Sequence, residues 1–276
     1  MRQRPGDSRL ASSRQTLTME RDLALEHIER DATRILELAT KMATLPAHEQ
    51  RIPSCPDWTL ADLANHLGRV YAMVTVALQG DPDEVLDRRT IPERPAEQSP
   101  ADWLHDRLDV LLGLLRARTE DDRAWNFAEG TGAPVGFWWR RQAHETLIHR
   151  VDAELAAGAE VEPVDPAFAA DGIGDFLLIG GHKQVSWEDL QLGDDLSVHL
   201  HATDTSDAEW TIDTGNRVYA TAHLKADVAV RGPAWALDLW LWRRGSAGST
   251  SDTGMPGLDL ETFGDVAAAE AWRPTL

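Results

Sequence analysis

The chain has 276 residues, of which 42% are hydrophobic and 26% charged, a composition typical of a globular protein with one large or two modest domains. Its formal net charge of −19 argues against nucleic acid and anionic membranes as partners, because both need a basic surface. A single cysteine, Cys55, excludes an internal disulfide and favours a reducing, cytoplasmic location, and no apolar run approaches the length of a membrane span.

The first 19 residues, MRQRPGDSRLASSRQTLTM, carry four arginines but no apolar segment. A secretory signal needs such a segment, so this stretch is not one. We expect a disordered tail over residues 1–19. Met19 is an alternative start of translation, and the sequence leaves that choice open.

Two segments in the first third of the chain have the features of helices. Residues 20–44 intersperse leucines and isoleucines with charges, as an amphipathic helix does. The next begins at Thr59, because Thr59 followed by Asp62 is an N-terminal capping pattern. This pattern predicts a helix over residues 59–78.

Two further helices have their own end signals. The Ser-Pro pair at 99–100 opens a helix that extends to residue 118. Gly158 ends another helix that covers residues 137–158. Four helices with short or moderate connections predict a four-helix bundle over residues 20–160.

The connections between these helices are rich in proline, glycine or charge. We expect a turn at IPSCPDW, residues 52–58, and a Gly/Pro segment at EGTGAPVG, residues 129–136, that leads into the fourth helix. Residues 81–99 are expected to form a surface loop.

The pattern of apolar and polar residues changes after Pro163. Residues 165–181 suggest one more helix, and another begins at about Gly264. Between them lie runs that alternate apolar and polar residues, as strands do. The runs are 196–204, 209–215, 218–226, 227–232 and 236–244, the last of which could equally belong to a helix over 233–244. Residues 245–257 are expected to form a flexible loop. We predict a smaller α+β domain over 163–276, and α+β as the fold class of the chain.

One of these runs places histidines on a single strand face. His199 and His201 alternate with Val198 and Leu200, so the two pairs point to opposite sides of a sheet. The histidines could add a site, but a solvated strand face is the favoured interpretation.

The stretch RQAHETLIHR at 141–150 holds candidate metal ligands. His144 and His149 are five residues apart, roughly 140° around a helix, so they do not form the zinc-protease motif, which needs a spacing of four. Glu145 and His149 are four apart and share a helix face. A helical wheel places both beside the apolar arc that faces the bundle.

A third candidate ligand, His66, borders the apolar seam of the helix over 59–78. Together with Glu145 and His149 it would make a three-ligand site with an open fourth position, the pattern of catalytic rather than structural zinc. The alternative for Glu145 and His149 is a satisfied polar pair at the bundle edge. His66 could equally be an ordinary half-buried histidine.

Two stretches, SCPDWTLADLANHLGRV at 54–70 and RRQAHETLIHRVDAE at 140–154, resemble the mycothiol-dependent maleylpyruvate isomerase family. Two later stretches are similar to the C-terminal domain of that family, DVAVRGPAWALDLWLWRR at 227–244 and LETFGDVAAAEAW at 260–272. The resemblance extends over about residues 25–276.

This resemblance implies a DinB-like N-terminal four-helix bundle followed by the family's C-terminal domain. It implies a divalent metal, usually zinc, bound by His66, Glu145 and His149. It also implies mycothiol, a cysteinyl pseudodisaccharide thiol, as cosubstrate. The family contains thiol transferases besides isomerases, so we expect a zinc-dependent enzyme that uses mycothiol either to isomerise or to S-conjugate a small electrophile.

The expected chemistry follows from a metal-bound thiol, which loses its proton readily. Its thiolate adds to an activated double bond, and rotation followed by elimination gives the geometric isomer. Departure of a leaving group gives a thiol conjugate instead. Asp152, one turn beyond His149, could orient that ligand, or could be a surface or capping carboxylate.

An anionic substrate such as a dicarboxylate would need a cation near the site. Arg243 is the favoured candidate and Arg231 an alternative, whereas Arg69 is expected to be a surface charge. Cys55 is interpreted as an inert turn cysteine rather than a nucleophile. Trp58 is expected to pack ahead of the Thr59 cap.

Other functions are compatible with parts of the pattern. The protein could be a non-catalytic metal- or thiol-binding protein that senses or recruits a partner, or a bundle that binds no metal. The intact ligand set favours the enzyme, because a binding module does not need an open metal position. We expect a monomer or a weak homodimer.

Overall fold

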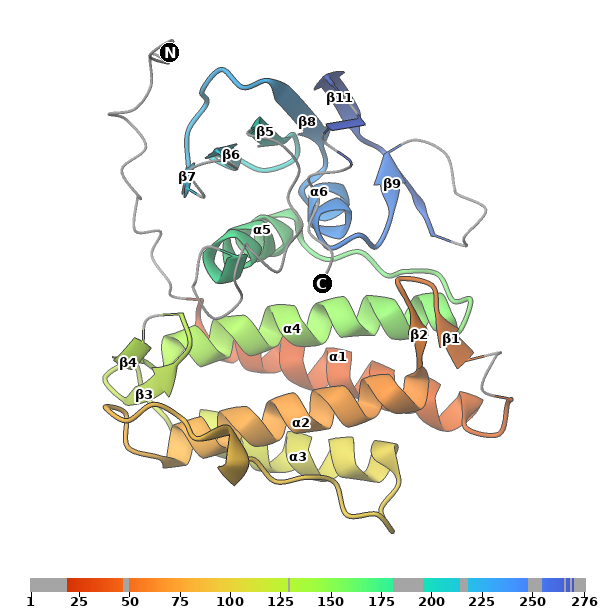
Figure 1. Cartoon of the computed structure of the whole chain (residues 1–276), viewed down its shortest axis with the longest axis vertical. Helices are drawn as coiled ribbons and strands as arrows, with labels where there is room; N and C mark the ends of the chain where they lie inside the picture. Colours follow the sequence, from red (N-terminus) through yellow and green to blue (C-terminus); the bar gives the residue numbers. More distant parts are fainter. Residues whose placement is uncertain are drawn as a thin grey trace. The chain divides into compact units, whose positions relative to one another are not determined.

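The computed structural model describes residues 19–46, 50–128, 130–180, 196–213, 218–247, 255–265, 267–268 and 270. The chain divides between Glu162 and Pro163 into two compact units (Figure 1). It contains helices and sheets that match the predicted α+β class. Residues 1–18 of the expected tail lie outside the described residues, and Met19 is buried.

The N-terminal unit contains the four predicted helices, α1 Arg21–Met42, α2 Leu60–Gln79, α3 Pro100–Arg116 and α4 Gly136–Ala156. Helix α1 packs mainly against α4, and α2 packs mainly against α3. The buried side chains include Ile28, Leu63, Leu67 and Leu111, which fill the interior between the helices. These apolar faces explain why the four segments assemble, because their burial is the main favourable contribution to folding.

The helix ends follow the predicted caps. The Thr59 hydroxyl accepts a hydrogen bond from the backbone N–H of Asp62, and the Asp62 carboxylate accepts one from the Thr59 N–H. The Ser99 hydroxyl accepts from the Asp102 N–H, and Pro100 begins α3. Gly158 follows α4 with a φ of 59°, a conformation that favours glycine.

The two proline- and glycine-rich connections contain short hairpins that were not predicted from the sequence. Strand β1 Arg51–Ile52 pairs with β2 Cys55–Thr59, and β3 Arg123–Asn126 pairs with β4 Gly130–Pro134. Pro56 lies inside the irregular part of the first ladder, between the paired residues, where a missing N–H is tolerated. The Arg51 guanidinium donates to the Asp57 carbonyl at 2.6 Å and reinforces this hairpin. The expected loop at 81–99 also contains a short 3₁₀ helix, η2 Arg88–Thr90.

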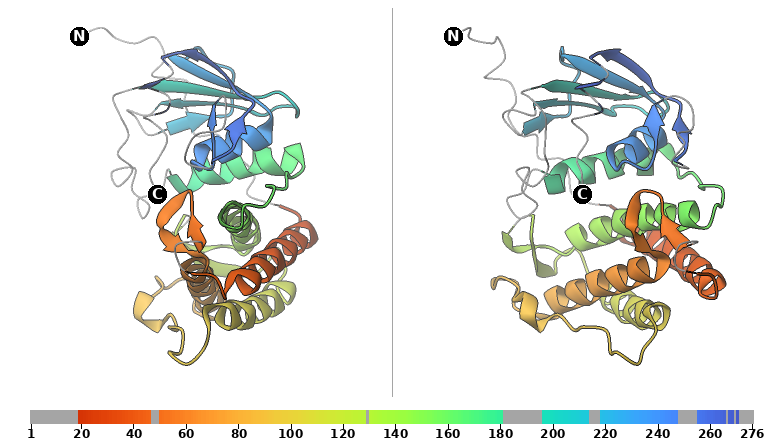
Figure 2. Two further views of the ribbon diagram at one scale, coloured as in Figure 1. Left: turned by 90° about the vertical axis from the view of Figure 1, so that its right-hand side faces the viewer. Right: turned by 45° about the vertical axis from the view of Figure 1, so that its right-hand side comes forward.

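The C-terminal unit begins with α5 Pro166–Gly180 and contains a five-stranded sheet in the order β11-β8-β5-β6-β7. Strands β5 and β8 are parallel, and the other neighbours are antiparallel. The strands are β5 Ser197–Ala202, β6 Glu209–Asp213, β7 Val218–Ala220, β8 Val228–Gly232 and β11 Glu261–Gly264. Helices α5 and α6 Ala234–Leu241 lie on one side of the sheet (Figure 2).

Several details of this unit differ from prediction or resolve an open choice. The ambiguous run before Arg244 is the helix α6 rather than a strand. Residues 261–264 form a strand, and helical structure within the described residues begins only at Ala267. The expected loop holds a short parallel pair, β9 Ser246–Ala247 and β10 Gly257–Leu258, and residues 248–254 lie outside the described ranges. No described helix is long and apolar enough to cross a membrane.

Two glycines give opposite predictions for the same substitution. A Cβ on Gly68 of α2 would overlap the buried indole of Trp103 on α3, whose other contacts include the Arg107 guanidinium 4.8 Å from the ring centre. Gly113 of α3 is exposed, and a Cβ there meets nothing within 4 Å. Gly68→Ala should therefore lower the free energy of unfolding by about 1–3 kcal/mol. Gly113→Ala should raise it by about 0.5–1 kcal/mol.

Urea denaturation of the two variants beside the unchanged protein measures both effects. An equal stabilisation by both substitutions would show that helix propensity, and not the close approach of α2 to α3, controls the Gly68 position.

Candidate metal centre

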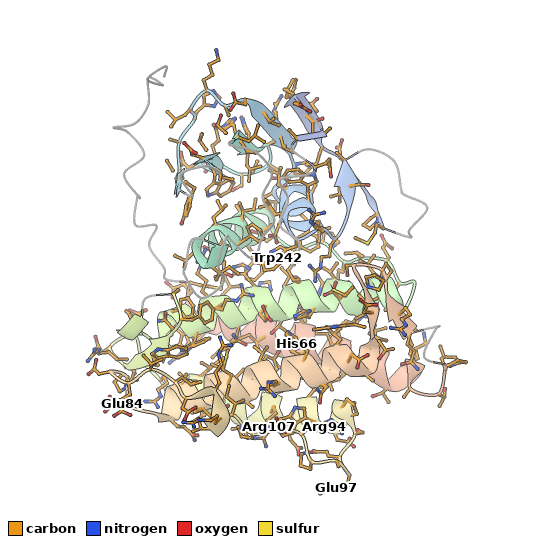
Figure 3. All side chains as sticks on the ribbon, viewed as in Figure 1. His66, Glu84, Arg94, Glu97, Arg107 and Trp242 are labelled. Atoms are coloured by element: carbon orange, nitrogen blue, oxygen red, sulfur yellow. The ribbon has the colours of Figure 1, made fainter. Side chains whose placement is uncertain are left out.

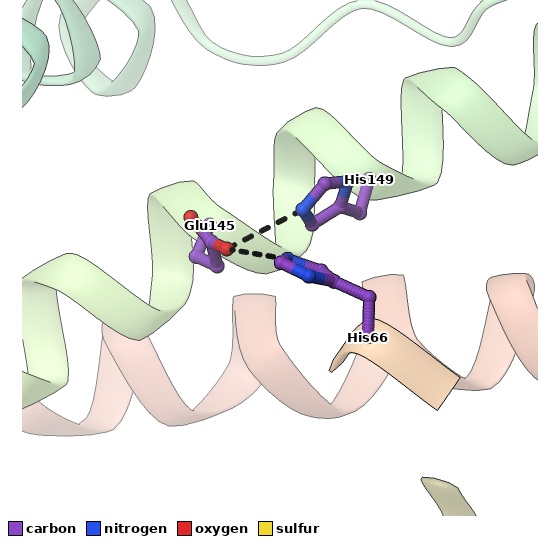
Figure 4. Close-up of side chains that lie close together, drawn as sticks. All are labelled: His66, Glu145 and His149. Carbon is purple, nitrogen blue, oxygen red and sulfur yellow. Dashed lines mark ion pairs between the residues drawn. The ribbon is translucent and has the colours of Figure 1, made fainter. Parts of the chain in front are cut away.

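Helices α2 and α4 bring His66, Glu145 and His149 together (Figure 4). The Oε1 atom of Glu145 lies 3.5 Å from Nε2 of His66 and 3.3 Å from Nε2 of His149. The two imidazole rings have their centres 5.0 Å apart at an angle of 73°. One ligand atom from each of the three residues lies within 4.8 Å of the others. The cluster therefore presents two imidazole nitrogens and one carboxylate oxygen to a common point.

Glu145 and His149 meet because a separation of four residues places them one turn apart on α4. His66 belongs to α2 and reaches the same point from the neighbouring helix, between the two ribbons (Figures 3 and 4). The side chains of His66, Glu145 and His149 are 35%, 18% and 10% exposed. The cluster is thus partly exposed, most at His66 and least at His149.

A buried arginine keeps Glu145 ionised. Burial by itself would raise the pKa of the Glu145 carboxyl. The guanidinium of Arg141, which contacts the second oxygen Oε2, and the hydrogen bonds from His149 and His66 outweigh burial and hold this pKa well below its usual range. Because Arg141 binds Oε2, Oε1 is the oxygen that faces the two histidines.

Asp152 contacts His149 from the next turn of α4. Its Oδ2 lies 3.0 Å from Nδ1 of His149, and its Oδ1 accepts a hydrogen bond from the Ser54 hydroxyl in the turn between β1 and β2. Asp152 is fully buried, so its interpretation as a surface carboxylate is wrong. Because Nδ1 is occupied by Asp152, Nε2 is the ring nitrogen that faces Glu145 and His66.

The same contacts make His149 a strong base in the absence of metal. Burial would lower the pKa of its imidazole, but the hydrogen bonds to Asp152 and Glu145 outweigh burial and raise this pKa to about 9. His149 therefore carries a positive charge at neutral pH and compensates one of the two neighbouring carboxylates.

Two further contacts fix the geometry around His66. The Trp58 ring from β2 lies 4.9 Å from the His66 ring at an angle of 51°, so Trp58 packs against the candidate ligand. Next to the cluster in sequence, the hydroxyls of Tyr71 on α2 and Thr146 on α4 are hydrogen-bonded in the interior, 2.7 Å apart. This bond joins the two helices next to Glu145.

The remaining predicted residues lie elsewhere. His144 is buried but does not belong to the ligand group, as its helical position predicts. Arg69 is exposed near Glu93, which confirms the prediction of a surface charge. Cys55 is half-buried and lies at the start of strand β2 rather than in a turn. Two residues of the site were not predicted. Arg141 has a signal in the sequence, because it lies four residues before Glu145, whereas Ser54 has none, because its partner Asp152 lies 98 residues away.

Three predicted residues of the C-terminal unit differ in their environments. Arg243 follows α6 with a φ of 58°, and burial lowers the pKa of its guanidinium, an effect that Glu270 opposes. Arg231 on β8 is exposed and lies 3.4 Å from Glu261. His199 is buried, so the interpretation of a solvated strand face is wrong for this residue.

The three side chains are suitable ligands for a divalent transition metal ion. Imidazole nitrogens and a carboxylate oxygen are established zinc ligands, and a histidine whose other nitrogen is bound by a carboxylate is the usual arrangement around such an ion. The pairing of His149 with Asp152 has this form.

The contact between Asp152 and His149 predicts how the pKa of His149 responds to mutation in the metal-free protein. Asp152→Asn should lower the pKa of His149 from about 9 toward its ordinary value of 6.5, because a carboxylate that favours the charged ring is lost. Histidine NMR titration in the presence of a chelator measures this change. Asp109→Asn, at an exposed position of α3, is the control and should leave the His149 titration unchanged.

The same shift has a consequence for stability. A folded pKa above the unfolded value stabilises the protein at pH values below 6.5, and this contribution is lost as the pH rises through about 9. In the presence of a chelator, the loss of unfolding free energy caused by Asp152→Asn should therefore become smaller as the pH rises from 6.5 to about 9. A pH-independent difference would show that Asp152 acts through its bond to Ser54 and not through the charge of His149.

Comparison with known proteins identifies the chain. Residues 30–154 match the family model of the mycothiol maleylpyruvate isomerase N-terminal domain, and residues 167–271 match that of the MDMPI C-terminal domain. No curated protein matches the sequence.

Two solved structures have a similar fold. A crystal structure of the mycothiol-dependent maleylpyruvate isomerase is 15% identical with a TM-score of 0.52, and the alignment covers 88% of this chain and 93% of that one. A crystal structure of a mutant of that enzyme is 12% identical with the same TM-score, over 80% and 88% of the two chains. At these identities the likeness concerns the fold. The two domain matches together cover most of the sequence, and the chain belongs to the mycothiol-dependent maleylpyruvate isomerase family.

Proposed function

We propose that this protein is a zinc-dependent enzyme that uses mycothiol as a thiol cosubstrate toward a small electrophile. The observation that carries the proposal is the convergence of His66, Glu145 and His149 on one point, with Asp152 behind His149. Membership of the family supports mycothiol as the thiol. A divalent ion bound to these residues would stabilise a thiolate at neutral pH.

The protein residues have distinct roles in this proposal. Arg141 binds one oxygen of Glu145 and keeps the carboxylate ionised, so the other oxygen is available as a ligand. Asp152 holds the proton of His149 at Nδ1 and leaves Nε2 as the donor atom. Ser54 fixes Asp152 from the β1–β2 turn, and Trp58 limits the movement of the His66 ring.

The outcome of the reaction depends on the electrophile. Addition of the thiolate to a conjugated double bond converts it to a single bond, and rotation followed by loss of the thiolate gives the other geometric isomer. If the electrophile carries a leaving group, the C–S bond remains and the leaving group departs with its electron pair. Isomerase and S-transferase chemistry therefore share one thiolate-delivering centre.

Arg243 is proposed as the cation that recognises an anionic electrophile such as a dicarboxylate. Its guanidinium can bind a carboxylate through two parallel hydrogen bonds, which lysine cannot do. Arg243→Lys should therefore raise KM for a dicarboxylate substrate while leaving the metal content unchanged. Arg231→Lys, at an exposed position beside Glu261, is the matched control.

Metal content tests the centre directly. His66→Ala, Glu145→Gln and His149→Ala should each remove one equivalent of zinc per chain, because two remaining protein ligands hold the ion weakly. His105→Ala on the surface of α3 should remove none, and neither should His144→Ala, which lies about 100° around α4 from Glu145 and outside the ligand group. Elemental analysis of tag-free protein dialysed against zinc gives the stoichiometry. Loss of zinc in His144→Ala together with retention in His149→Ala would contradict the assignment.

Turnover tests the chemistry. The protein with zinc and mycothiol should convert a member of a panel that includes maleylpyruvate and an aromatic halide, with isomers and conjugates followed separately. The rate should depend on added thiol, fall below detection after zinc removal, and rise at a pH below the value of about 8.5 typical of a free thiol.

Cys55→Ser is the control for a protein nucleophile. It should leave the rate nearly unchanged, because Cys55 lies outside the ligand group. Turnover that persists without added thiol and disappears in Cys55→Ser would contradict the mechanism.

A further inference from the structure

A second group of metal-binding side chains lies on the five-stranded sheet of the C-terminal unit. His199 belongs to β5, Glu209 begins β6, and His223 follows the edge strand β7. Val198 and Leu200 on β5 are fully buried on the side covered by α6, so the alternation of the strand places His199 on the opposite face. Figure 2 shows no described helix over that face.

The pairing of β5 with β6 brings Glu209 to the histidines. Glu209 is directly opposite His201, and Thr211 is directly opposite His199. Glu209 reaches diagonally across this pair, with its Oε2 atom 3.0 Å from Nε2 of His199. Its other oxygen, Oε1, lies 3.7 Å from Nδ1 of His201.

His223 completes the group from a different segment. Its Nδ1 lies 2.6 Å from Oε2 of Glu209, and its ring centre is 4.7 Å from that of His199. One donor atom each from His199, Glu209 and His223 lies within 4.8 Å of the other two. The two contacts of Glu209, 3.0 Å to His199 and 2.6 Å to His223, are hydrogen-bond lengths, shorter than the roughly 3.3 Å between ligand atoms that each lie about 2 Å from a tetrahedral ion, so the side chains would move apart by a few tenths of an ångström to bind one.

The backbone on both sides of His223 is held in place. The Thr211 hydroxyl donates to the carbonyl of Ala222 at 2.8 Å and accepts from the N–H of Leu224 at 3.3 Å. These two bonds bracket His223 and keep its segment against β6. The imidazole therefore remains above Glu209 even though it is 74% exposed. The position of His223 beside Glu209 therefore depends on backbone hydrogen bonds at Ala222 and Leu224 as well as on the His223 side chain itself.

We propose that His199, Glu209 and His223 form a second binding site for a divalent transition metal ion of the zinc class. Two imidazoles and a carboxylate are a suitable ligand set for such an ion. His201 lies beside the group and can hold the remaining oxygen of Glu209. The exposed side of His223 leaves a coordination position open to solvent.

A metal at this site would cross-link three segments of the unit. It would join the inner strands β5 and β6 to the chain that follows β7, which is an edge strand with β6 as its one neighbour. Without metal, β6 holds this segment through the two bonds of the Thr211 hydroxyl to the backbone and the contact of Glu209 with His223. Zinc binding should therefore slow amide hydrogen exchange at 218–224, in a part of the structure separate from the His66 centre.

Zinc stoichiometry of the full-length, tag-free protein tests the proposal. After removal of metal with a chelator and dialysis against zinc chloride, the unchanged chain should hold one equivalent more than His223→Ala or Glu209→Gln. Because His223 is exposed, its replacement should leave the circular dichroism spectrum unchanged. His105→Ala, an exposed histidine 3.9 Å from Asp109, is the matched control and should lose no zinc.

Combination with His66→Ala separates this site from the first centre. His66→Ala and His223→Ala should each remove a different equivalent, and the double variant should remove both. Zinc that is lost in His223→Ala but retained in His66→Ala would support the second site and contradict the proposed function. Equal zinc in the unchanged chain, His223→Ala and Glu209→Gln would overturn the inference, leaving the three side chains as a hydrogen-bonded polar group without metal.

Hydrogen exchange provides the second readout. Zinc should slow exchange at 218–224 in the unchanged chain and in His66→Ala, but not in His223→Ala. The same slowing in His223→Ala would assign the effect to another site and would also overturn the inference.

Discussion

The N-terminal unit depends on one costly interaction, an ionised Glu145 carboxylate placed largely out of water between α2 and α4. A buried charge is stable only with charged or hydrogen-bonding partners. Arg141 supplies the opposite charge on one oxygen, and His66 and His149 bind the other. The same arrangement that satisfies the carboxylate also brings together the donor atoms of the candidate metal centre. In this bundle, therefore, electrostatic compensation and the proposed chemistry use the same residues.

The surrounding structure keeps this group in register. The Tyr71–Thr146 hydrogen bond joins α2 to α4 beside the carboxylate, and burial raises the pKa of the Tyr71 hydroxyl far above its usual range, so it stays protonated. The β1–β2 hairpin contributes from outside the helices, because its Ser54 binds Asp152 and its Trp58 packs on His66. A short connection between two helices thus becomes part of the support for both histidines.

The two units reach the same donor set by different backbone geometry. On α4, a separation of four residues places Glu145 and His149 together within one element. On the sheet, residues from β5, β6 and the segment after β7 meet only because the strands pair in one register. A shift of one residue in that register would move His199 to the face that holds Val198 and Leu200. The metal inferred on the sheet would consequently be more sensitive to strand pairing than the centre in the bundle.

The sequence by itself determined the local features of this protein. Apolar periodicity, the Thr59 and Ser99 caps and Gly158 predicted four helices whose ends agree with the structure within two residues, because these signals act over a single turn. The common face of Glu145 and His149 followed from helical geometry in the same way. Tertiary structure decided the two hairpins, the bond between Ser54 and Asp152, and the burial of His199 beside Glu209 and His223. These features join residues that are distant in sequence or depend on strand register, and no short-range pattern specifies which side chains will meet when apolar faces are buried.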